Sequence, residues 1–448
     1  MFSNKVKGYL SLISSILINL LNGNLFSFPN LIPYYQSYLY YKYNKTEQIS
    51  LMQLYFIAPI GMFVDSVFPI FMGMLDIKLG IRVLTIFTTV SLYISQIIIY
   101  FSIEYYLLVI SYIVYGFGVS ATNYQTVRNC WKYFPDKKDL MSGIIFSSFG
   151  LGSFVFTSIA DFIINPDNIA KEGKYYSKEI SYRYLTYLKF FILCIVILGA
   201  ISIILNFPFE EENENNTHEI SENENKDKII LKKSEIIPLK KIILSMEFVK
   251  CLSIAGCTLI FGYLLSNTYR NFGIEKKLDE NNMHTLSKVF TLLNTFSRLL
   301  WGIICHKFKF KIPYIIIIIN QIACGCLIYF SAYKFITYFI VVCLAVLSYS
   351  GHVILFPSLI WSKFGVEHSV ILFGIVGIFS GLSALIGPLL TYFIKDLKDY
   401  LITYLVGVAP SIVSLILTIF IKTERMVIVD KDIKVITEEN EEDKKLLT

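Results

Sequence analysis

Long runs of apolar residues alternate along this chain with short polar segments. Four clear examples are 83–102, 107–126, 312–329 and 401–421. A helix needs about 20 apolar residues to cross a hydrocarbon core about 30 Å thick, and lipid requires each spanning segment to pair its own backbone groups. Because these runs are too long for strands, the pattern predicts membrane-spanning helices.

Twelve such spans are expected, six on each side of a charged central segment. Their approximate ranges are 8–34, 50–72, 83–102, 105–127, 140–162, 184–206, 246–269, 286–305, 312–332, 335–357, 369–394 and 400–422. We therefore predict an all-α polytopic membrane protein. It comprises an N-terminal six-helix half (1–209), a charged linker (210–245), a C-terminal six-helix half (246–422) and a charged tail (423–448).

Two sequence landmarks recur at nearly the same offset in the two halves. Trp-Lys-Tyr-Phe at 131–134 is echoed by Trp-Ser-Lys-Phe at 361–364, and Gly-Met-Leu-Asp at 73–76 is echoed more weakly by Gly-Ile-Ile-Cys at 302–305. A shared offset indicates duplicated halves. In transporters built from repeats, the binding site lies near the midplane between them.

Composition and charge exclude several other classes of protein. Apolar residues make up 55 % of the chain, above the roughly 45–50 % of soluble domains. The net charge of +6 comes from lysine-rich loops, so nucleic-acid binding is not expected. The eight cysteines have no metal-ligand spacing, and no catalytic motif is recognisable. We expect neither an enzyme nor a cofactor or metal site.

Several short motifs resemble those of one transporter superfamily. The segment 73–82 (Gly-Met-Leu-Asp-Ile-Lys-Leu-Gly-Ile-Arg) resembles the loop signature of the major facilitator superfamily. Further motifs resemble its oxalate/formate antiporter and monocarboxylate transporter branch: Lys132–Lys138, Ser142-Gly143, Phe149–Ser153, Gly23–Phe28, Asn294–Gly302, Phe356-Pro357 and the stretch from Gly381 to Pro388. The resemblance covers nearly the whole chain apart from the linker and tail. It implies a twelve-helix fold of two halves and a transport function.

The loop signature also carries a candidate conformational latch. Glycine lets helix ends pack closely, and an aspartate in the loop can pair with a basic group. We expect Gly73, Asp76, Gly80 and Arg82 to form this latch.

Arg298 is the main candidate for substrate binding. It lies eight residues, or about 12 Å, before the loop that follows the eighth span, which places it near the membrane midplane. A guanidinium there costs about 2.5–3.5 kcal/mol on insertion scales, so it should face a wet cavity or a partner. Its planar fork suits a carboxylate, and the resemblance implies this role. A structural ion pair is the alternative. Asn294, one turn earlier, can share the contact.

Asp65 is the second charge inside a predicted span. It lies eleven residues, or about 16 Å, before Asp76. Burial in hydrocarbon disfavours a carboxylate, so Asp65 is a candidate proton carrier. A static pair with a basic residue is an equally open reading, and the resemblance supplies no acid at this position.

Other polar and aromatic residues in the spans are candidates for the cavity lining. They are Asn24 and Phe28 in the first span, Tyr124 in the fourth, and Tyr349 and His352 in the tenth. Hydrogen bonding between helices is the alternative for all of them. For His352 a satisfied packing role is the alternative to a proton relay.

The chain departs from the branch pattern at two places. Alignment on Gly381 puts Ser380 where oxalate exchangers carry a lysine for a second carboxylate. Its loss favours a monoanion, which one arginine neutralises. In the loop after the eighth span, His306-Lys307 replaces an expected acid, which argues against a second latch in the C-terminal half.

These observations lead to a functional hypothesis. We expect a secondary active transporter for a small monocarboxylate of the pyruvate, lactate or formate type, working by alternating access with proton coupling or anion exchange. The alternatives are a carrier of another metabolite (sugar, amino acid or vitamin carboxylate) or a drug, and a non-transporting membrane scaffold.

The expected partners are a small organic anion, protons and the lipid bilayer, and the protein is expected to be monomeric. Basic residues are more frequent at the amino terminus, the linker and the loops on their side than on the opposite side. This bias places both termini in the cytoplasm. The membrane is either the plasma membrane or that of an organelle.

Overall fold

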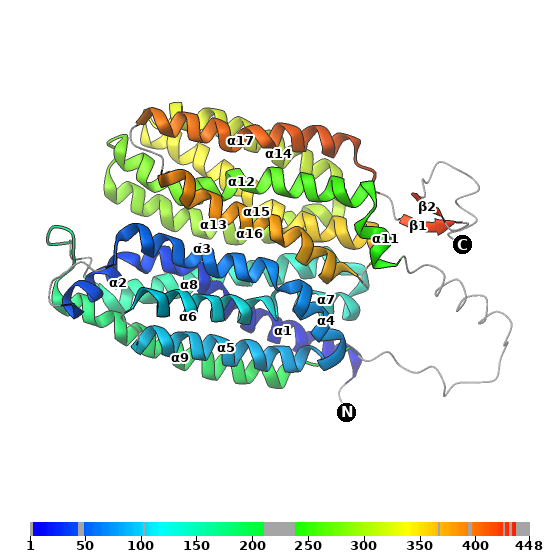
Figure 1. Cartoon of the computed structure of the whole chain (residues 1–448), viewed down its shortest axis with the longest axis horizontal. Coiled ribbons are helices and arrows are strands. Elements are labelled where there is room, and N and C mark those ends of the chain that lie inside the picture. Colours follow the sequence, from blue (N-terminus) through cyan, green and yellow to red (C-terminus); the bar gives the residue numbers. More distant parts are fainter. Residues whose placement is uncertain are drawn as a thin grey trace.

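The structure confirms a chain that is helical almost throughout (Figure 1). It is a computed structural model that describes residues 3–43, 49–101, 104–167, 169, 171–209, 238–365, 368–392, 397–423, 426–429 and 432–435. Most of the predicted linker, up to residue 237, and the end of the tail, from residue 436, lie outside the described residues.

The first half contains the first six spans. Its elements are α1 (Asn4–Asn22), η1 (Gly23–Ser27), α2 (Phe28–Lys42), α3 (Leu51–Val67), α4 (Pro69–Leu79), α5 (Ile81–Phe101), α6 (Tyr105–Ser120), α7 (Asn123–Tyr133), η2 (Pro135–Lys137), α8 (Lys138–Ile164) and α9 (Lys178–Leu205). Serine N-caps open several of these helices. Ser50 and Gln53 form a complete capping box at the start of α3.

The second half contains the last six spans. Its elements are α11 (Leu239–Ile243), α12 (Met246–Glu275), α13 (Glu280–Phe308), α14 (Lys311–Ser331), α15 (Phe335–Phe364), α16 (Ser369–Tyr392), α17 (Leu397–Phe420), β1 (Met426–Val429) and β2 (Asp432–Val435). The two strands pair antiparallel, with Met426 opposite Val435. This short hairpin lies in the tail, where the sequence indicated only a charged segment.

Breaks divide several spans into shorter helices. In the second span, α3 and α4 meet at a 49° bend. Pro69 stands at the start of α4, where proline has no N–H to complete the helical ladder. Among the described residues, eleven helices are long and apolar enough to cross a membrane, and this bent pair, taken as one span, makes a twelfth. The prediction of twelve spans is confirmed.

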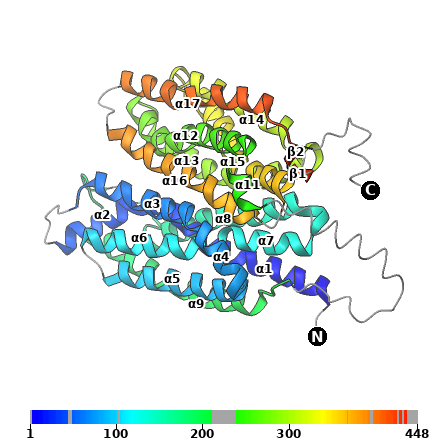
Figure 2. The ribbon, with the colours of Figure 1, turned by 45° about the vertical axis from the view of Figure 1, so that its right-hand side comes forward.

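The two halves lie side by side along their whole length (Figures 1 and 2). Helix α1 begins and α17 ends at the same end of the bundle, on the right in Figure 1. We call this the terminal end and the opposite one the far end. One buried cluster, rich in tyrosine, fills the first half, and two clusters fill the second. A smaller cluster that includes Trp131, Phe146 and Ile354 joins them.

Glycines set the distance between the halves. A Cβ atom on Gly143 of α8 would lie 3.3 Å from the Cα of Gly302 on α13. On the other seam, a Cβ on Gly377 of α16 would lie 2.4 Å from the carbonyl oxygen of Ser66 on α3. In lipid, small residues permit this approach where no hydrophobic effect drives the helices together. The halves are therefore closely packed from the terminal end to the middle of the bundle.

The tightest helix contact lies inside the first half and can be tested by substitution. A Cβ on Gly152 of α8 would lie 1.9 Å from the carbonyl oxygen of Leu20 on α1. Since backbone must move to relieve this clash, Gly152→Ala should lower the thermal unfolding midpoint of the detergent-purified protein strongly, because overpacking costs about 1–3 kcal/mol or more. In the control Gly256→Ala, the new Cβ meets the partly exposed Phe379 ring at 3.1 Å, so the midpoint should change little. Equal midpoints would contradict the packing argument.

Candidate functional site

A cavity lies between the two halves, near the middle of the bundle. Its empty volume is about 980 Å³, counted together with its opening. The first half contributes mainly apolar side chains, among them Phe26, Pro29, Pro59, Met62 and Phe149. The second half contributes mainly polar ones, among them Tyr263, Ser266, Asn267, Asn294, Arg298 and Tyr349. The cavity has the size and the mixed lining of small-molecule sites.

Arg298 lies in the wall of this cavity, where the sequence predicted a binding residue. Its side chain comes from α13 and the residue is 5 % exposed. Nη1 donates to the carbonyl oxygen of Phe146 at 2.9 Å, and Cζ lies 6.0 Å from the ring centroid of Phe149. Among the described residues no carboxylate pairs with Arg298, and its buried Nε has no hydrogen-bond partner. The positive charge is therefore uncompensated.

Three further predicted residues surround this charge. Asn294 lines the cavity, and its buried Oδ1 has no partner among the described residues. Tyr349 also lines the cavity, and its ring centroid lies 5.5 Å from that of Tyr263. The Tyr263 and Ser380 hydroxyls are 3.0 Å apart. Ser380 thus reaches the site through Tyr263, a residue that sequence reasoning missed although its polar hydroxyl interrupts an apolar span.

Two predicted residues of the first span lie in the core of the first half instead. Asn24 accepts a hydrogen bond from the Tyr187 hydroxyl at 2.9 Å. Phe28 packs against Tyr112, with ring centroids 4.8 Å apart. Neither faces the cavity, because this side of the broken first span packs onto the rest of its own half.

His352 is likewise buried inside its own half. Its Nε2 lies 2.8 Å from Gln321 Oε1, and its Nδ1 lies 3.1 Å from the Tyr314 hydroxyl. Both ring nitrogens are occupied by neighbouring helices, so the packing alternative describes its position.

Tyr124 and Asp65 lie near the cavity but outside its lining. Tyr124 packs against Phe373 of the second half, with ring centroids 4.9 Å apart. Asn123 donates to both carboxylate oxygens of Asp65, from 3.5 and 3.4 Å. In the part of the chain that the structure describes, Asp65 forms no ion pair. The alternative hypothesis, a static ion pair of Asp65 with a basic residue, thus finds no partner among the described residues in this conformation.

The predicted latch residues are found at the terminal end of the first half. Asp76 accepts from Arg128 of α7, with Oδ2 and Nη1 3.3 Å apart. A Cβ on Gly73 would lie 2.9 Å from Val370 Cγ1 of the second half. Gly80 has φ +77°, which favours glycine. Arg82 does not reach Asp76 and instead donates to the carbonyl oxygen of Asn206 at 3.1 Å.

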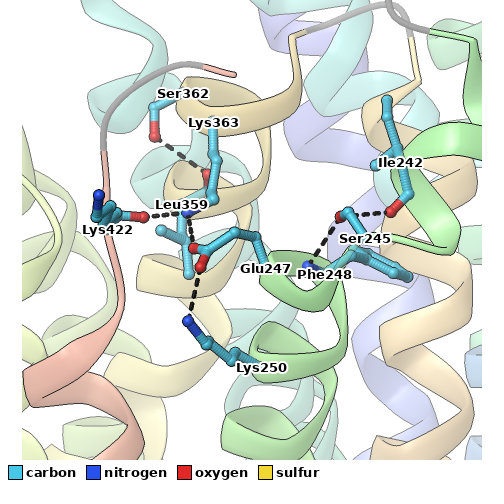
Figure 3. Close-up of polar contacts among 9 residues, drawn as sticks. All are labelled: Ile242, Ser245, Glu247, Phe248, Lys250, Leu359, Ser362, Lys363 and Lys422. Atoms are coloured by element: carbon cyan, nitrogen blue, oxygen red, sulfur yellow. Dashed lines mark hydrogen bonds and ion pairs between the residues drawn. The ribbon is translucent and has the colours of Figure 1, made fainter. Parts of the chain in front are cut away.

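The second half has a charged contact at the same end that sequence reasoning missed (Figure 3). Lys363, at the end of α15, is fully buried and pairs with Glu247 Oε2 at 2.5 Å. It also donates to the carbonyl oxygen of Lys422, while Lys250 pairs with Glu247 Oε1 at 2.7 Å. The acid absent from the loop after α13 is thus replaced by one at the start of α12. The only signal in the sequence was Lys363 within the repeated Trp-Ser-Lys-Phe motif.

The repeated tryptophans lie at the terminal end, where the two halves pack together. The ring centroids of Trp131 and Trp361, one from each half, are 6.2 Å apart. Lys138 Nζ lies 4.5 Å from the Trp361 ring centroid, a cation–π contact. The landmarks that revealed the duplication therefore meet each other across the interface of the two halves.

Comparisons with known proteins agree with this architecture. The family model described as "Major Facilitator Superfamily" matches residues 12–388. Among solved structures, the chain is similar to the proton:xylose symporter XylE bound to 6-bromo-6-deoxy-D-glucose. The two share 11 % sequence identity at a TM-score of 0.66, over 92 % of this chain and 95 % of that one. This likeness concerns the fold. No curated protein matches the sequence.

The Asp76–Arg128 pair can be tested with a double-mutant cycle. Both side chains are largely buried, with 13 % and 10 % exposed, so either single change leaves a poorly solvated charge behind. Asp76→Asn and Arg128→Gln should each lower the unfolding midpoint in detergent. The double variant should lose less unfolding free energy than the two single variants lose together, and the difference, the coupling energy, should be about 1 kcal/mol. Additive effects would show that the pair contributes nothing.

Proposed function

Because the chain belongs to the major facilitator superfamily, whose members are transporters, we propose that it is a secondary carrier for a small monocarboxylate anion. One observation carries this proposal: the uncompensated guanidinium of Arg298 in the cavity wall. A buried charge is costly unless it is paired. Within the described residues no acid supplies the pairing, so a carboxylate on the substrate is its natural partner.

The number of charges in the cavity favours a single carboxylate. Of the lining residues that the structure describes, Arg298 alone is charged. Ser380, at the place of a second cation in oxalate exchangers, is a neutral hydroxyl that faces Tyr263. A second carboxylate bound beside the first would have no cation to compensate it.

The two closely packed seams and the cavity between them support alternating access as the mode of transport. At the terminal end Trp131 and Trp361 pack against each other across the two halves, whereas toward the far end Asn30 and Thr291 line both the cavity and an outer hollow. This conformation would admit substrate from the far side. With the termini in the cytoplasm, as the basic residues favour, the far side is the outer one.

A carboxylate on a larger metabolite is a second candidate, and the cavity itself favours it. Tyr55, Tyr263, Tyr269 and Phe290 contribute aromatic surface to its lining, which suits a larger and partly apolar substrate. A neutral sugar, the ligand class of the similar symporter, would leave the charge of Arg298 without a partner.

Arg298→Gln tests the anion-binding role. In proteoliposomes loaded with pyruvate, saturable counterflow of labelled pyruvate should fall by about 30-fold or more, since truncating one partner of a buried charge pair costs at least about 2 kcal/mol. Arg298→Lys should restore part of the rate, because it keeps the charge but loses the fork.

The matched control is Arg183→Gln, which removes an arginine that pairs with Glu179 at the far end, outside the lining of the cavity. It should leave counterflow unchanged. Undiminished counterflow in a folded Arg298→Gln protein would refute the role. If wild-type protein exchanges only larger carboxylates, the second candidate replaces the first.

Asp65→Asn tests proton coupling. If the Asp65 carboxyl carries the proton, the variant should lose the acceleration of net uptake by an inward proton gradient but retain pyruvate exchange, which needs no net proton movement. Asn123, its partner, stays able to donate to the new amide oxygen. Uptake that still responds fully to the gradient would remove Asp65 from the coupling mechanism.

A further inference from the structure

A second hollow lies at the far end, directly outside the cavity. Its empty volume is about 760 Å³, again counted with its opening. Tyr34, Asp161 and Lys171 of the first half and Arg270, Ser287 and Lys288 of the second half line it. Asn30 and Thr291 line both spaces, so the hollow and the cavity are neighbours.

Cations outnumber acids in the lining of this outer hollow. Arg270 and Lys288 form no ion pair within the described part of the chain, and Lys171 Nζ lies 5.6 Å from the Tyr176 ring centroid. Asp161, the one carboxylate among the described lining residues, accepts a hydrogen bond from the Tyr34 hydroxyl at 3.3 Å. A concave surface with a single sign of excess charge concentrates the opposite charge from solution.

One face of α13 connects the hollow to Arg298. Lys288, Thr291, Asn294 and Arg298 follow one another at intervals of three, three and four residues, which places them on the same helical face. At 1.5 Å per residue, the face runs about 15 Å from Lys288 to Arg298. It begins and ends with a cation and carries polar side chains between them.

We propose that the outer hollow is a capture site for organic carboxylates. The anions bind there before they move along α13 to Arg298, a step that rests on the proposed function. Arg270 and Lys288 supply the attraction. Their partial exposure makes binding weak, since exposed ion pairs are worth at most about 1 kcal/mol each. A weak outer site suits a relay because it raises the local concentration of the anion without retaining it.

Residues from both halves line the outer hollow, so the capture site exists only while the halves are apart at the far end. When the halves close at the far end, the Arg270 and Lys288 wall on the second half must approach the Asp161 wall on the first. The carboxylate of Asp161 then competes with a captured anion for the same cations. Closure therefore weakens the hold of Arg270 and Lys288 on the anion, and Arg298 is the next cation along this face of α13.

Transport kinetics give the first test. The Arg270→Gln/Lys288→Gln double variant should raise the apparent KM for external pyruvate about five- to tenfold at low ionic strength and leave the maximal rate unchanged. Added salt should raise the KM of the wild type toward that of the variant. The control Lys178→Gln/Lys334→Gln makes the same charge change at the far end outside the hollow, and should keep the wild-type KM. An unchanged KM in the first variant would overturn the capture site.

A labelling experiment tests the attraction without any transport. In detergent-purified Ser287→Cys protein, the new thiol lies in the hollow, and its modification can be followed by mass spectrometry of its peptide. The quantity to compare is the ratio of the labelling rates of an anionic and a cationic methanethiosulfonate. This ratio should be about tenfold higher in the Ser287→Cys protein than in the same protein with Arg270→Gln and Lys288→Gln added. Pyruvate should slow the reaction.

The two tests fail in different ways. If the ratio of anionic to cationic labelling does not depend on Arg270 and Lys288, the inference is wrong whatever the protein transports. If the ratio depends on them but pyruvate neither protects the thiol nor is transported, the carboxylate assignment, and with it the capture of carboxylates, is wrong. The capture site is supported if pyruvate slows labelling of the thiol and this protection is lost when both Arg270 and Lys288 are substituted.

Discussion

The structure depends on how closely its helices approach one another. Lipid offers no hydrogen-bond partners to the backbone and no hydrophobic effect drives the helices together, so close packing must hold them. Glycines provide that approach, both inside the first half, where Gly152 meets the Leu20 carbonyl, and between the halves, along the α8–α13 and α3/α4–α16 seams. The seams end near the middle of the bundle: Gly150 faces Thr295 and also lines the cavity. The cavity begins where glycine-mediated contact stops.

A buried guanidinium is tolerated at this point because neutral polar and aromatic groups replace part of its hydration. Arg298 donates to the carbonyl oxygen of Phe146 and lies over the Phe149 ring, and the hydroxyl-bearing rings of Tyr263 and Tyr349 line the same cavity. These groups are neutral and leave the net charge intact. An ion pair would have stabilised the arginine more, but it would also have occupied the fork that an anion needs. The cavity therefore keeps its charge available at a cost in stability.

The sequence was sufficient for the spans, the duplication, the pairing of Asp76 and the place of Arg298, since each rests on hydropathy, repetition or a charge in an apolar run. It did not place Asn24, Phe28 and His352, which lie in the cores of their halves. A polar residue in a spanning helix can face a cavity or a neighbouring helix, and hydropathy does not distinguish the two. The Glu247–Lys363 pair was missed because 116 residues separate its members.

Under the proposed function, Arg298 also links substrate recognition to the movement of the halves. It belongs to α13, but the carbonyl that it binds belongs to α8, so its hydrogen bond crosses the seam that closes the terminal end. A ligand shifts a conformational equilibrium only by its different affinity for the two states. A carboxylate that draws the guanidinium into the cavity competes with the Phe146 carbonyl for the Arg298 N–H. The more strongly the carboxylate binds, the more it weakens this hydrogen bond across the seam. The same competition does not arise for a neutral ligand. In the proposed mechanism, the charge that selects the substrate therefore also makes the opening of the terminal end depend on its presence.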